Sequence, residues 1–467
     1  MALKDIDHFV FCMLENRSFD HMLGYLSLED APRRLPVDGL RSDAAWQASF
    51  RNRGDGQPYS LKPLTGADRI DDPPHGRDRI KAQIETGAEG QAHMGGFVQA
   101  YIDSRREADK PIPADPGAVM GYYKADSVST FDFLARNYCV CDRWFAPVPL
   151  GTQANKLMAM AGESKVIDNE TGITTHRLVY DWLKHNAKVK WRVYQWGDYF
   201  PFFTLMDIWV TRILTSLVTN RGNFRRYKKF KKDWTTAKKV PSVIFIEPDY
   251  SDGLGSNAND DHPPTGIAGG QALIRDIYET LISNPERWAK TLLIITYDEH
   301  GGFFDHVPPL PIATKIRDQT FRTTGPRVPA LLVSPHVGRG TVFSEPLDHT
   351  AFLQLLAERF TPENGYSRAV NERLAQNVLG RLSNAVRGRP RTGNPPKFGQ
   401  ELEFKAAQPA GPAGPSNTPI GVAFYEAARR VEREHPELLN AQVKAALAEH
   451  AAPQPLSSDH IAEPPRT

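Results

Sequence analysis

Two pairs of polar residues stand directly after short apolar runs of the sequence and could together bind a metal ion. Glu15 and Asn16 follow one run, and Asp298 and Glu299 follow another. Carboxylate and amide oxygens suit a hard or borderline divalent cation. The spacing also allows each pair to cap a following helix, because acids and Asn are common at helix N-termini.

Thr152 is a candidate nucleophile at a predicted helix start. It lies in the segment 150–156, Leu-Gly-Thr-Gln-Ala-Asn-Lys, just ahead of an apolar run that continues to residue 161. The N-terminus of a helix carries partial positive charge and attracts a phosphoryl or sulfuryl anion. The Thr152 hydroxyl would either cap this helix or attack the bound anion if a metal lowered its pKa.

Two histidines lie in proline-containing loops that would hold them rigidly. His75 ends the segment Asp-Asp-Pro-Pro-His, and His262 lies in Asn-Asp-Asp-His-Pro-Pro. Each could bind a ligand or serve the structure, and the spacing leaves both interpretations open. Three further histidines follow in the second half of the chain: His300, His306 and His349.

The elements that must position these residues are predicted from four apolar runs without polar alternation. These runs cover residues 8–14, 242–246, 291–296 and 328–333. Such runs are typical of parallel strands buried on both faces. Helical spacing over 269–284 and 350–360 lies between and after them. The alternation predicts a doubly wound α/β/α sandwich, in which ligands bind beyond the carboxyl ends of the strands.

The remaining segments give a coarse domain prediction. We expect a catalytic domain over residues 1–385, with insertions at about 27–127 and 165–240. Residues 386–467 are predicted to form a linker rich in Pro, Gly and Arg, followed by a tail that is helical from 423 to 448 and interrupted near Pro436.

Composition excludes several classes of protein. Lys plus Arg is 57 and Asp plus Glu is 55, giving a net charge of +2, so nothing in the global charge favours nucleic acid as a partner. No run approaches 18 apolar residues, which argues against a spanning helix. The sequence shows no leader, which predicts either a cytoplasmic protein or an exported one whose leader is missing from this sequence.

One basic segment could contact a membrane. Residues 221–232 hold seven Lys or Arg, interrupted by Phe224, Tyr227 and Phe230, and follow an apolar pattern at 202–218. An interfacial helix with a polybasic segment would dock peripherally on anionic lipid. Alternatively, the three aromatic residues form the buried stripe of a surface helix.

Three motifs in this sequence closely resemble the bacterial phosphoesterase family. They are Glu-Asn-Arg-Ser-Phe-Asp-His at 15–21, Tyr-Asp-Glu-His-Gly-Gly-Phe-Phe-Asp-His-Val at 297–307, and Gly-Pro-Arg-Val-Pro at 325–329. That family contains non-haemolytic and haemolytic phospholipases C and a group of acid phosphatases within the alkaline phosphatase superfamily. The resemblance covers about residues 5–360.

The resemblance implies an alkaline phosphatase-like α/β/α sandwich with one divalent metal ion (Ca, Mg, Mn or Zn) in its active site. It implies two pairs of metal ligands, a nucleophile that also binds the metal and forms a phosphothreonine, a pocket histidine, and a second histidine that matches more loosely. These residues are, in that order, Glu15 with Asn16, Asp298 with Glu299, Thr152, His262 and His75.

The activity that the resemblance implies is phosphoric ester hydrolysis of the phospholipase C type. The substrate would be a phosphodiester, phospholipids included. The alternative enzyme is a phosphomonoesterase of the acid phosphatase type, in which the nucleophile is a Ser. A non-enzymatic membrane-binding module is the alternative from another class.

Overall fold

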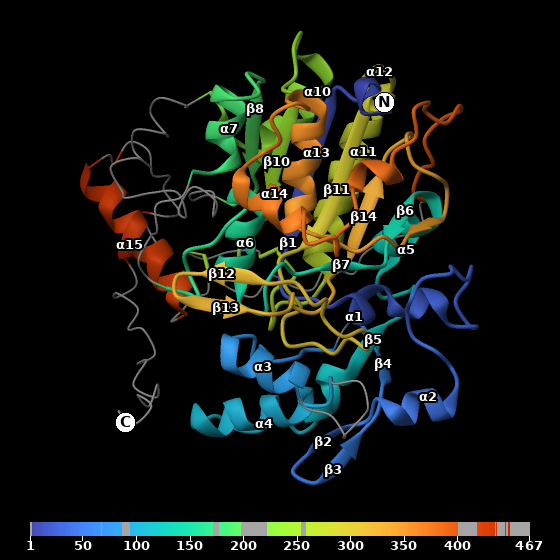
Figure 1. Ribbon diagram of the computed structural model, residues 1–467, viewed down its shortest axis with the longest axis vertical. Coiled ribbons are helices and arrows are strands. Elements are labelled where there is room, and N and C mark those ends of the chain that lie inside the picture. The colour runs from blue at the N-terminus through green and yellow to red at the C-terminus, as the bar shows by residue number, and fades with distance from the viewer. Residues whose placement is uncertain are drawn as a thin grey trace.

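The computed structural model describes residues 2–66, 68–85, 94–170, 177–197, 222–253, 258–399 and 418–434, and single positions between 436 and 448. A twisted sheet of eight strands forms its centre (Figure 1). The strand order is β15-β6-β14-β11-β1-β10-β8-β9. The strands are β1 (His8–Leu14), β6 (Cys139–Cys141), β8 (Trp191–Gln195), β9 (Phe224–Arg226), β10 (Val243–Glu247), β11 (Thr291–Tyr297), β14 (Ala330–Val333) and β15 (Thr341–Phe343).

All of these strands except β14 run in the same direction. β1 pairs in parallel with both β10 and β11, and every residue of β10 and β11 is buried. The predicted buried strands are therefore confirmed. β14 pairs antiparallel with β11 and with β6, so the sheet is mixed. The apolar run 328–333 indicated a strand but carried no information on its direction, since burial on both faces looks the same either way.

Helices cover both faces of the sheet, which confirms the predicted α/β/α sandwich. Phe9 and Phe11 of β1 contact Phe360 and Phe352, at ring-centroid distances of 5.8 and 4.4 Å. Their neighbour His8 points the other way. One layer contains α6 (Thr152–Ala161), α13 (Thr350–Phe360) and α14 (Arg368–Leu374), and the other contains α5 (Ser129–Asn137), α10 (Phe230–Thr236), α11 (Ala268–Ile282) and α12 (Pro285–Trp288).

The described part of residues 27–127 forms a layer next to the carboxyl-terminal edge of the sheet (Figure 1). It has its own apolar cluster, built mainly from α3, α4 and η3, to which Phe304 of the second motif contributes. Its elements are α2 (Ala44–Ser49), β2 (Asn52–Gly54), β3 (Gln57–Tyr59), β4 (Lys62–Leu64), α3 (Arg77–Glu85), α4 (Phe97–Glu107), η3 (Pro116–Met120) and β5 (Gly121–Tyr123).

Residues 165–240, predicted as an insertion, supply β8 and β9 to the edge of the main sheet. They also form α7 (Val179–His185). The basic segment is not one helix: Phe224 lies in β9, Tyr227 begins the short helix η4 (Tyr227–Lys229), and Phe230 begins α10. The predicted helical stripe is therefore wrong, although Tyr227 and Phe230 are buried. The apolar pattern at 202–218 lies outside the described residues.

Beyond residue 385, the chain remains in contact with the sandwich. Phe398 packs on Phe133, with ring centroids 4.0 Å apart. Helix α15 (Pro419–Glu434) begins four residues before the predicted helical stretch and overlaps its first part, and its Phe424 contacts Tyr250. Most of the predicted continuation to 448 lies outside the described residues. Within the described part of the chain, no helix has both the length and the apolar character to cross a membrane.

Short elements complete the described chain. They are η1 (Ala2–Asp5), α1 (Phe19–Leu23), η2 (Gly24–Ser27), β7 (Trp144–Phe145), β12 (Thr314–Ile316), β13 (Gln319–Phe321), β16 (Leu347–Asp348) and η5 (Leu382–Ala385).

A buried ion network ties the three sequence motifs together beneath the candidate site. Arg327 Nε donates to Asp305 Oδ1 at 2.8 Å and Nη2 donates to Asp20 Oδ1 at 3.1 Å. His306 Nδ1 donates to Asp20 Oδ2 at 2.7 Å, and its other ring nitrogen lies 3.3 Å from Asp38 Oδ1. Arg327 comes from the third motif, Asp305 and His306 from the second, and Asp20 from the first. These motif residues therefore hold the loops of the site in place.

The His306 imidazole makes this network sensitive to pH. Burial alone would lower its pKa, but Asp20 and Asp38 raise the pKa to about 9, against the opposing charge of Arg327. A pKa raised by folding stabilises the protein fully below the unfolded value of about 6.5, and this contribution is lost as pH rises to about 9.

We predict that His306→Gln lowers the free energy of unfolding by about 2 to 3 kcal/mol at pH 6, and by much less at pH 9.5. Urea unfolding of the variant and the wild type across this pH range measures the difference. His185→Gln is the control, since His185 is exposed. A His306→Gln deficit that stays constant from pH 6 to pH 9.5 would contradict the charged state of His306.

Candidate active site

The two polar pairs meet at the carboxyl-terminal edge of the sheet because β1 and β11 are neighbours. Leu14 and Tyr297 are opposite each other in the parallel register, so the next residues of both strands emerge side by side. The backbone N–H of Asn16 donates to Asp298 Oδ1 at 3.0 Å. The sequence prediction that the two pairs lie together is confirmed.

Local backbone conformation fixes how closely these loops approach. Asn16 has a φ of 61°, in the left-handed region that Asn tolerates better than most residues. Gly301 has a φ of 64°, and a Cβ there would lie 2.2 Å from the carbonyl oxygen of Asn16. Glycine is therefore required at 301 for the second motif to pass over the first.

The capping alternative is wrong for both pairs. Helix α1 is capped by Ser18, whose side chain accepts from the backbone N–H of His21. After Asp298 and Glu299 the chain forms turns and short strands, and the next helix begins at Thr350. The two pairs thus do not serve as helix caps.

Four buried oxygen atoms of the predicted site have no hydrogen-bond partner among the described residues. They belong to four different residues of the predicted ligand set: Asn16 Oδ1, Thr152 Oγ1, Asp298 Oδ2 and Glu299 Oε1. Leaving one buried polar atom without a partner costs about 1 to 3 kcal/mol, so such atoms are few in folded proteins. All four are oxygens, the donor type that hard divalent cations prefer.

Thr152 opens helix α6 but does not cap it. Gly151 is the N-cap residue, and Thr152 is the first helical residue with only 1% of its surface exposed. A Cβ at Gly151 would lie 3.3 Å from the carbonyl oxygen of His75, so the start of α6 lies directly against the His75 loop. The Thr152 hydroxyl is therefore buried at a helix N-terminus and is available for chemistry.

Lys156 is a site residue that the sequence interpretation missed. It lies one helical turn after Thr152, on the same face of α6, and its buried Nζ pairs with Glu15 Oε1. The same ammonium group lies 4.2 Å from the centroid of the Tyr250 ring. Its spacing of four residues from Thr152 was the available signal.

His75 and His262 lie next to each other and next to the first polar pair. Their ring centroids are 5.7 Å apart, and His75 Nε2 lies 3.4 Å from Asn16 Nδ2. Asp72, which also received no role from the sequence, has an oxygen 3.6 Å from His75 Nδ1. The proline-containing loops thus bring both predicted histidines into the site.

The electrostatics of the site favour protonated histidines. Burial alone would lower the pKa of His262, but Asp72, Asp252, Glu15 and Asp260 raise it to about 10. Burial opposes the charge on His75 as well, yet carboxylates including Asp72 raise its pKa above the ordinary value. Both rings can therefore donate hydrogen bonds at neutral pH.

The carboxyl groups of the site carry more negative charge than their neighbours balance. Burial and the charge of Glu15 raise the pKa of Asp298 to about 7, although Lys156 opposes the shift. Burial and Glu15 likewise raise the pKa of Asp260 to about 8. Glu299 differs, because His75 and His300 outweigh burial and lower its pKa.

Two sets of groups near the site could accept a cation. Asp72, His75 and His262 offer ligand atoms within 4.8 Å of one another. A metal bound to this group would have to displace the protons of the two imidazoles, whereas an anion could accept hydrogen bonds from them. The partnerless oxygens of the predicted set fit a divalent cation by donor type. Among the described residues, the three carboxylates of that set do not come within 4.8 Å of one another as a group, and Glu15 is paired with Lys156 instead.

His349 and His300 support the second polar pair from behind. Trp144 Nε1 can only donate, so His349 Nδ1 accepts from it at 2.9 Å and His349 Nε2 donates to the carbonyl oxygen of Asp298 at 2.7 Å. Burial lowers the pKa of His349 to about 4, so this ring is neutral. His300 shares a hydrogen bond with Gln83 of α3 at 2.8 Å.

A comparison with protein families identifies the class of protein that this fold and site define. The profile of the phosphoesterase family matches residues 6–361. This match spans the central strands β1, β10 and β11 and every predicted site residue. The chain belongs to the phosphoesterase family, which confirms the resemblance seen in its motifs.

Several curated relatives are phospholipases C. Non-specific phospholipase C6 of Arabidopsis thaliana is 32% identical over 364 residues, covering 72% of this chain and 63% of the plant protein. Non-hemolytic phospholipase C of Pseudomonas aeruginosa is 28% identical over 403 residues, covering 77% of this chain and 54% of that protein. The chain thus spans about half to two thirds of the length of these relatives.

Solved structures with low sequence identity also match. Murine ectonucleotide pyrophosphatase/phosphodiesterase 5 matches with a TM-score of 0.31 and 10% identity, over 54% of this chain and 95% of its own. A protein of the alkaline phosphatase superfamily from Vibrio parahaemolyticus matches with a TM-score of 0.31 and 10% identity, over 52% of this chain and 62% of its own.

We predict that Lys156→Met destabilises the metal-free protein by about 3 to 5 kcal/mol, because Glu15 is then buried without its cation. Urea unfolding in EDTA at pH 7 measures this loss. Lys156→Arg, which keeps the positive charge, is the matched control and should lose much less. Equal stability of Lys156→Met and the wild type would show that the Glu15 carboxylate does not need this partner.

Proposed function

We propose that this protein is a metal-dependent phosphoric ester hydrolase, a phospholipase C-like phosphodiesterase that acts through a phosphothreonine at Thr152. The observation that carries the proposal is the set of four partnerless buried oxygens on Asn16, Thr152, Asp298 and Glu299. Membership of the phosphoesterase family and the names of the curated relatives support the reaction class.

The residues around Thr152 suit in-line attack on phosphorus. The N-terminus of α6 attracts the phosphoryl anion, and the protonated rings of His75 and His262 can donate hydrogen bonds to its non-bridging oxygens. A divalent cation bound to the oxygen ligands would lower the pKa of the Thr152 hydroxyl and offset the charge of the phosphoryl group. Asn16 is neutral, which limits the negative charge that an anionic substrate meets.

The reaction divides into two displacements. After the Thr152 hydroxyl has lost its proton to solvent water, Oγ1 forms a bond to phosphorus, the bond from phosphorus to the leaving alcohol breaks, and one of the two protonated histidines protonates that alcohol. The same histidine, now neutral, takes a proton from water as the water attacks phosphorus. The bond from phosphorus to Thr152 Oγ1 breaks in this step, which releases the phosphomonoester and restores the deprotonated Thr152 and the protonated ring.

A phospholipid substrate requires an approach to a lipid surface. The basic segment has four exposed lysines: Lys228, Lys229, Lys231 and Lys232. We propose that these lysines contact anionic lipid peripherally.

We predict that Thr152→Ala lowers turnover by about 10³-fold or more while leaving the fold intact, because no other hydroxyl takes its place. Thr152→Ser keeps a hydroxyl and is the matched control, with activity retained in part. Turnover of p-nitrophenyl phosphorylcholine, bis-p-nitrophenyl phosphate and p-nitrophenyl phosphate measures both the effect and the ester class.

The same assay separates the two enzymatic candidates. Faster hydrolysis of the two diesters than of the monoester supports a phospholipase C-like enzyme. Hydrolysis of the monoester alone would instead establish a phosphatase of the acid phosphatase type. No turnover of any ester by the metal-loaded wild type would leave the non-enzymatic alternative. Near wild-type turnover by Thr152→Ala would refute the assigned nucleophile.

We predict that Asp298→Asn binds less metal than the wild type, since it replaces one carboxylate of the ligand set. Metal content after dialysis, measured by mass spectrometry, is the first readout, and Glu372→Gln on the exposed face of α14 is the control. Wild-type protein stripped by EDTA should lose turnover and regain it with Ca, Mg, Mn or Zn added singly. Full turnover by protein whose metal content is verified as zero would rule out metal dependence.

A further inference from the structure

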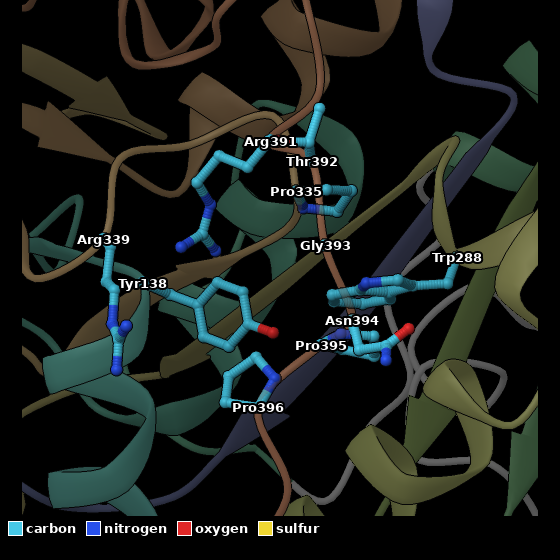
Figure 2. Close-up of a pocket in the computed structure, with 10 residues that line it drawn as sticks. All are labelled: Tyr138, Trp288, Pro335, Arg339, Arg391, Thr392, Gly393, Asn394, Pro395 and Pro396. Atoms are coloured by element: carbon cyan, nitrogen blue, oxygen red, sulfur yellow. The ribbon is translucent and has the colours of Figure 1, made fainter.

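A cavity lies at the opposite end of the sheet from the candidate active site. Its volume is about 480 Å³ (Figure 2). Trp288 comes from α12, which precedes β11, and Pro335 and Arg339 follow the antiparallel strand β14. The cavity is therefore at the amino-terminal edge of the parallel strands. The seven residues of β11 separate it from Asp298 by about 20 Å.

The rest of the cavity wall is Tyr138 and the segment 391–396, which the main domain holds in place. The backbone N–H of Arg391 donates to the carbonyl oxygen of Pro335 at 2.8 Å. The Tyr278 hydroxyl donates to the carbonyl oxygen of Pro396 at 2.5 Å. Between these anchors, Gly393 has a φ of 99°, and a Cβ there would meet no atom within 4 Å. The segment thus forms a preformed rim around open space.

Positive charge gathers at this cavity without acidic partners. Arg339 and Arg391 line it, and Arg387 is close enough to affect Arg391 electrostatically. None of the three forms an ion pair with any described residue. The strongest charge effects on Arg391 come from these two arginines and from the hydroxyls of Tyr138 and Tyr278. Burial and the two neighbouring arginines lower the pKa of Arg391.

The guanidinium of Arg391 has an unused donor. Its central carbon lies 5.0 Å from the centroid of the Tyr138 ring, and Nη2 lies 3.5 Å from the carbonyl oxygen of Ser334. Nε is buried and has no hydrogen-bond partner among the described residues. Figure 2 shows the side chains of Arg339 and Arg391 beside the Tyr138 ring, with Trp288 and Asn394 across from them. Paired guanidinium groups are the usual donors to phosphate oxygens.

We propose that this cavity binds a soluble oxyanion of the phosphate class, either inorganic phosphate or a small phosphomonoester. An anion there would offset the repulsion between Arg339 and Arg391 and could accept hydrogen bonds from their guanidinium groups. A phosphate group is also carried by lipid headgroups. A lipid surface at this cavity would hold the candidate active site on the far side of the protein, about 20 Å away, so a soluble ligand fits the geometry better. The proposal does not depend on the proposed function.

The test is calorimetric titration of the full chain with inorganic phosphate. We expect a phosphate site in the wild type whose affinity falls at least tenfold in the double variant Arg339→Gln/Arg391→Gln. Arg368→Gln is the control, because the Arg368 side chain is 90% exposed and pairs with the exposed Glu372. Phosphate bound at the candidate active site should be unaffected by the double variant, and so should turnover of p-nitrophenyl esters.

Two outcomes would overturn the proposal. One is an identical phosphate titration in the wild type and the double variant, which would assign all binding to the candidate active site. The other is loss of co-sedimentation with phosphatidic acid vesicles in the double variant without any change in phosphate titration, which would assign the cavity to a lipid headgroup. If the double variant does not fold, the single variant Arg339→Glu replaces it in the titration. Arg339 is exposed, and reversing its charge should abolish phosphate binding at the cavity.

Discussion

The candidate site depends on the burial of several carboxylates at adjacent strand ends. β1 and β11 run in parallel and in register, which brings Glu15 and Asp298 to the same place, and Asp260 follows from the loop after β10. Their mutual repulsion and burial raise the pKa of Asp298 to about 7 and that of Asp260 to about 8. Lys156 is the cation of the described chain that pairs with Glu15. The surrounding structure must keep these carboxylates close together despite their mutual electrostatic repulsion.

Neutral and cationic side chains around the site keep its loops in position. Arg327 joins Asp20 and Asp305 below the loops, and neutral His349 fixes the carbonyl of Asp298 from behind. Gly301 allows the second motif to approach the backbone of Asn16. The motifs thus combine two tasks: Asn16, Asp298 and Glu299 present unpaired oxygens at the candidate site. Later motif residues such as Asp20, Asp305 and Arg327 hold the loops in place.

The strands and most residues of the candidate site could be predicted from the sequence, but strand direction and the exact position of the helix cap could not. Apolar runs without alternation can only lie between two covering layers, so the sandwich could be predicted. The antiparallel direction of β14 could not, because burial on both faces has no polarity. Likewise, Thr152 and Gly151 are both acceptable N-cap residues, and only the backbone shows that Gly151 takes this position. Lys156 went unassigned because a lysine at helical spacing is usually solvent-exposed.

The difference between two acidic clusters shows which one is built for a ligand. Asp20, Asp305 and His306 offer ligand atoms within 4.8 Å of one another, yet Arg327 donates to both aspartates and leaves the cluster satisfied. At the strand ends, Lys156 reaches Glu15, whereas oxygens of Asp298 and Glu299 keep no partner among the described residues. Because the Arg327 guanidinium is always charged, the cluster of Asp20, Asp305 and His306 serves the structure and needs no further cation. The unfilled acceptors of the second cluster are the physical reason for proposing that a metal and the substrate bind there.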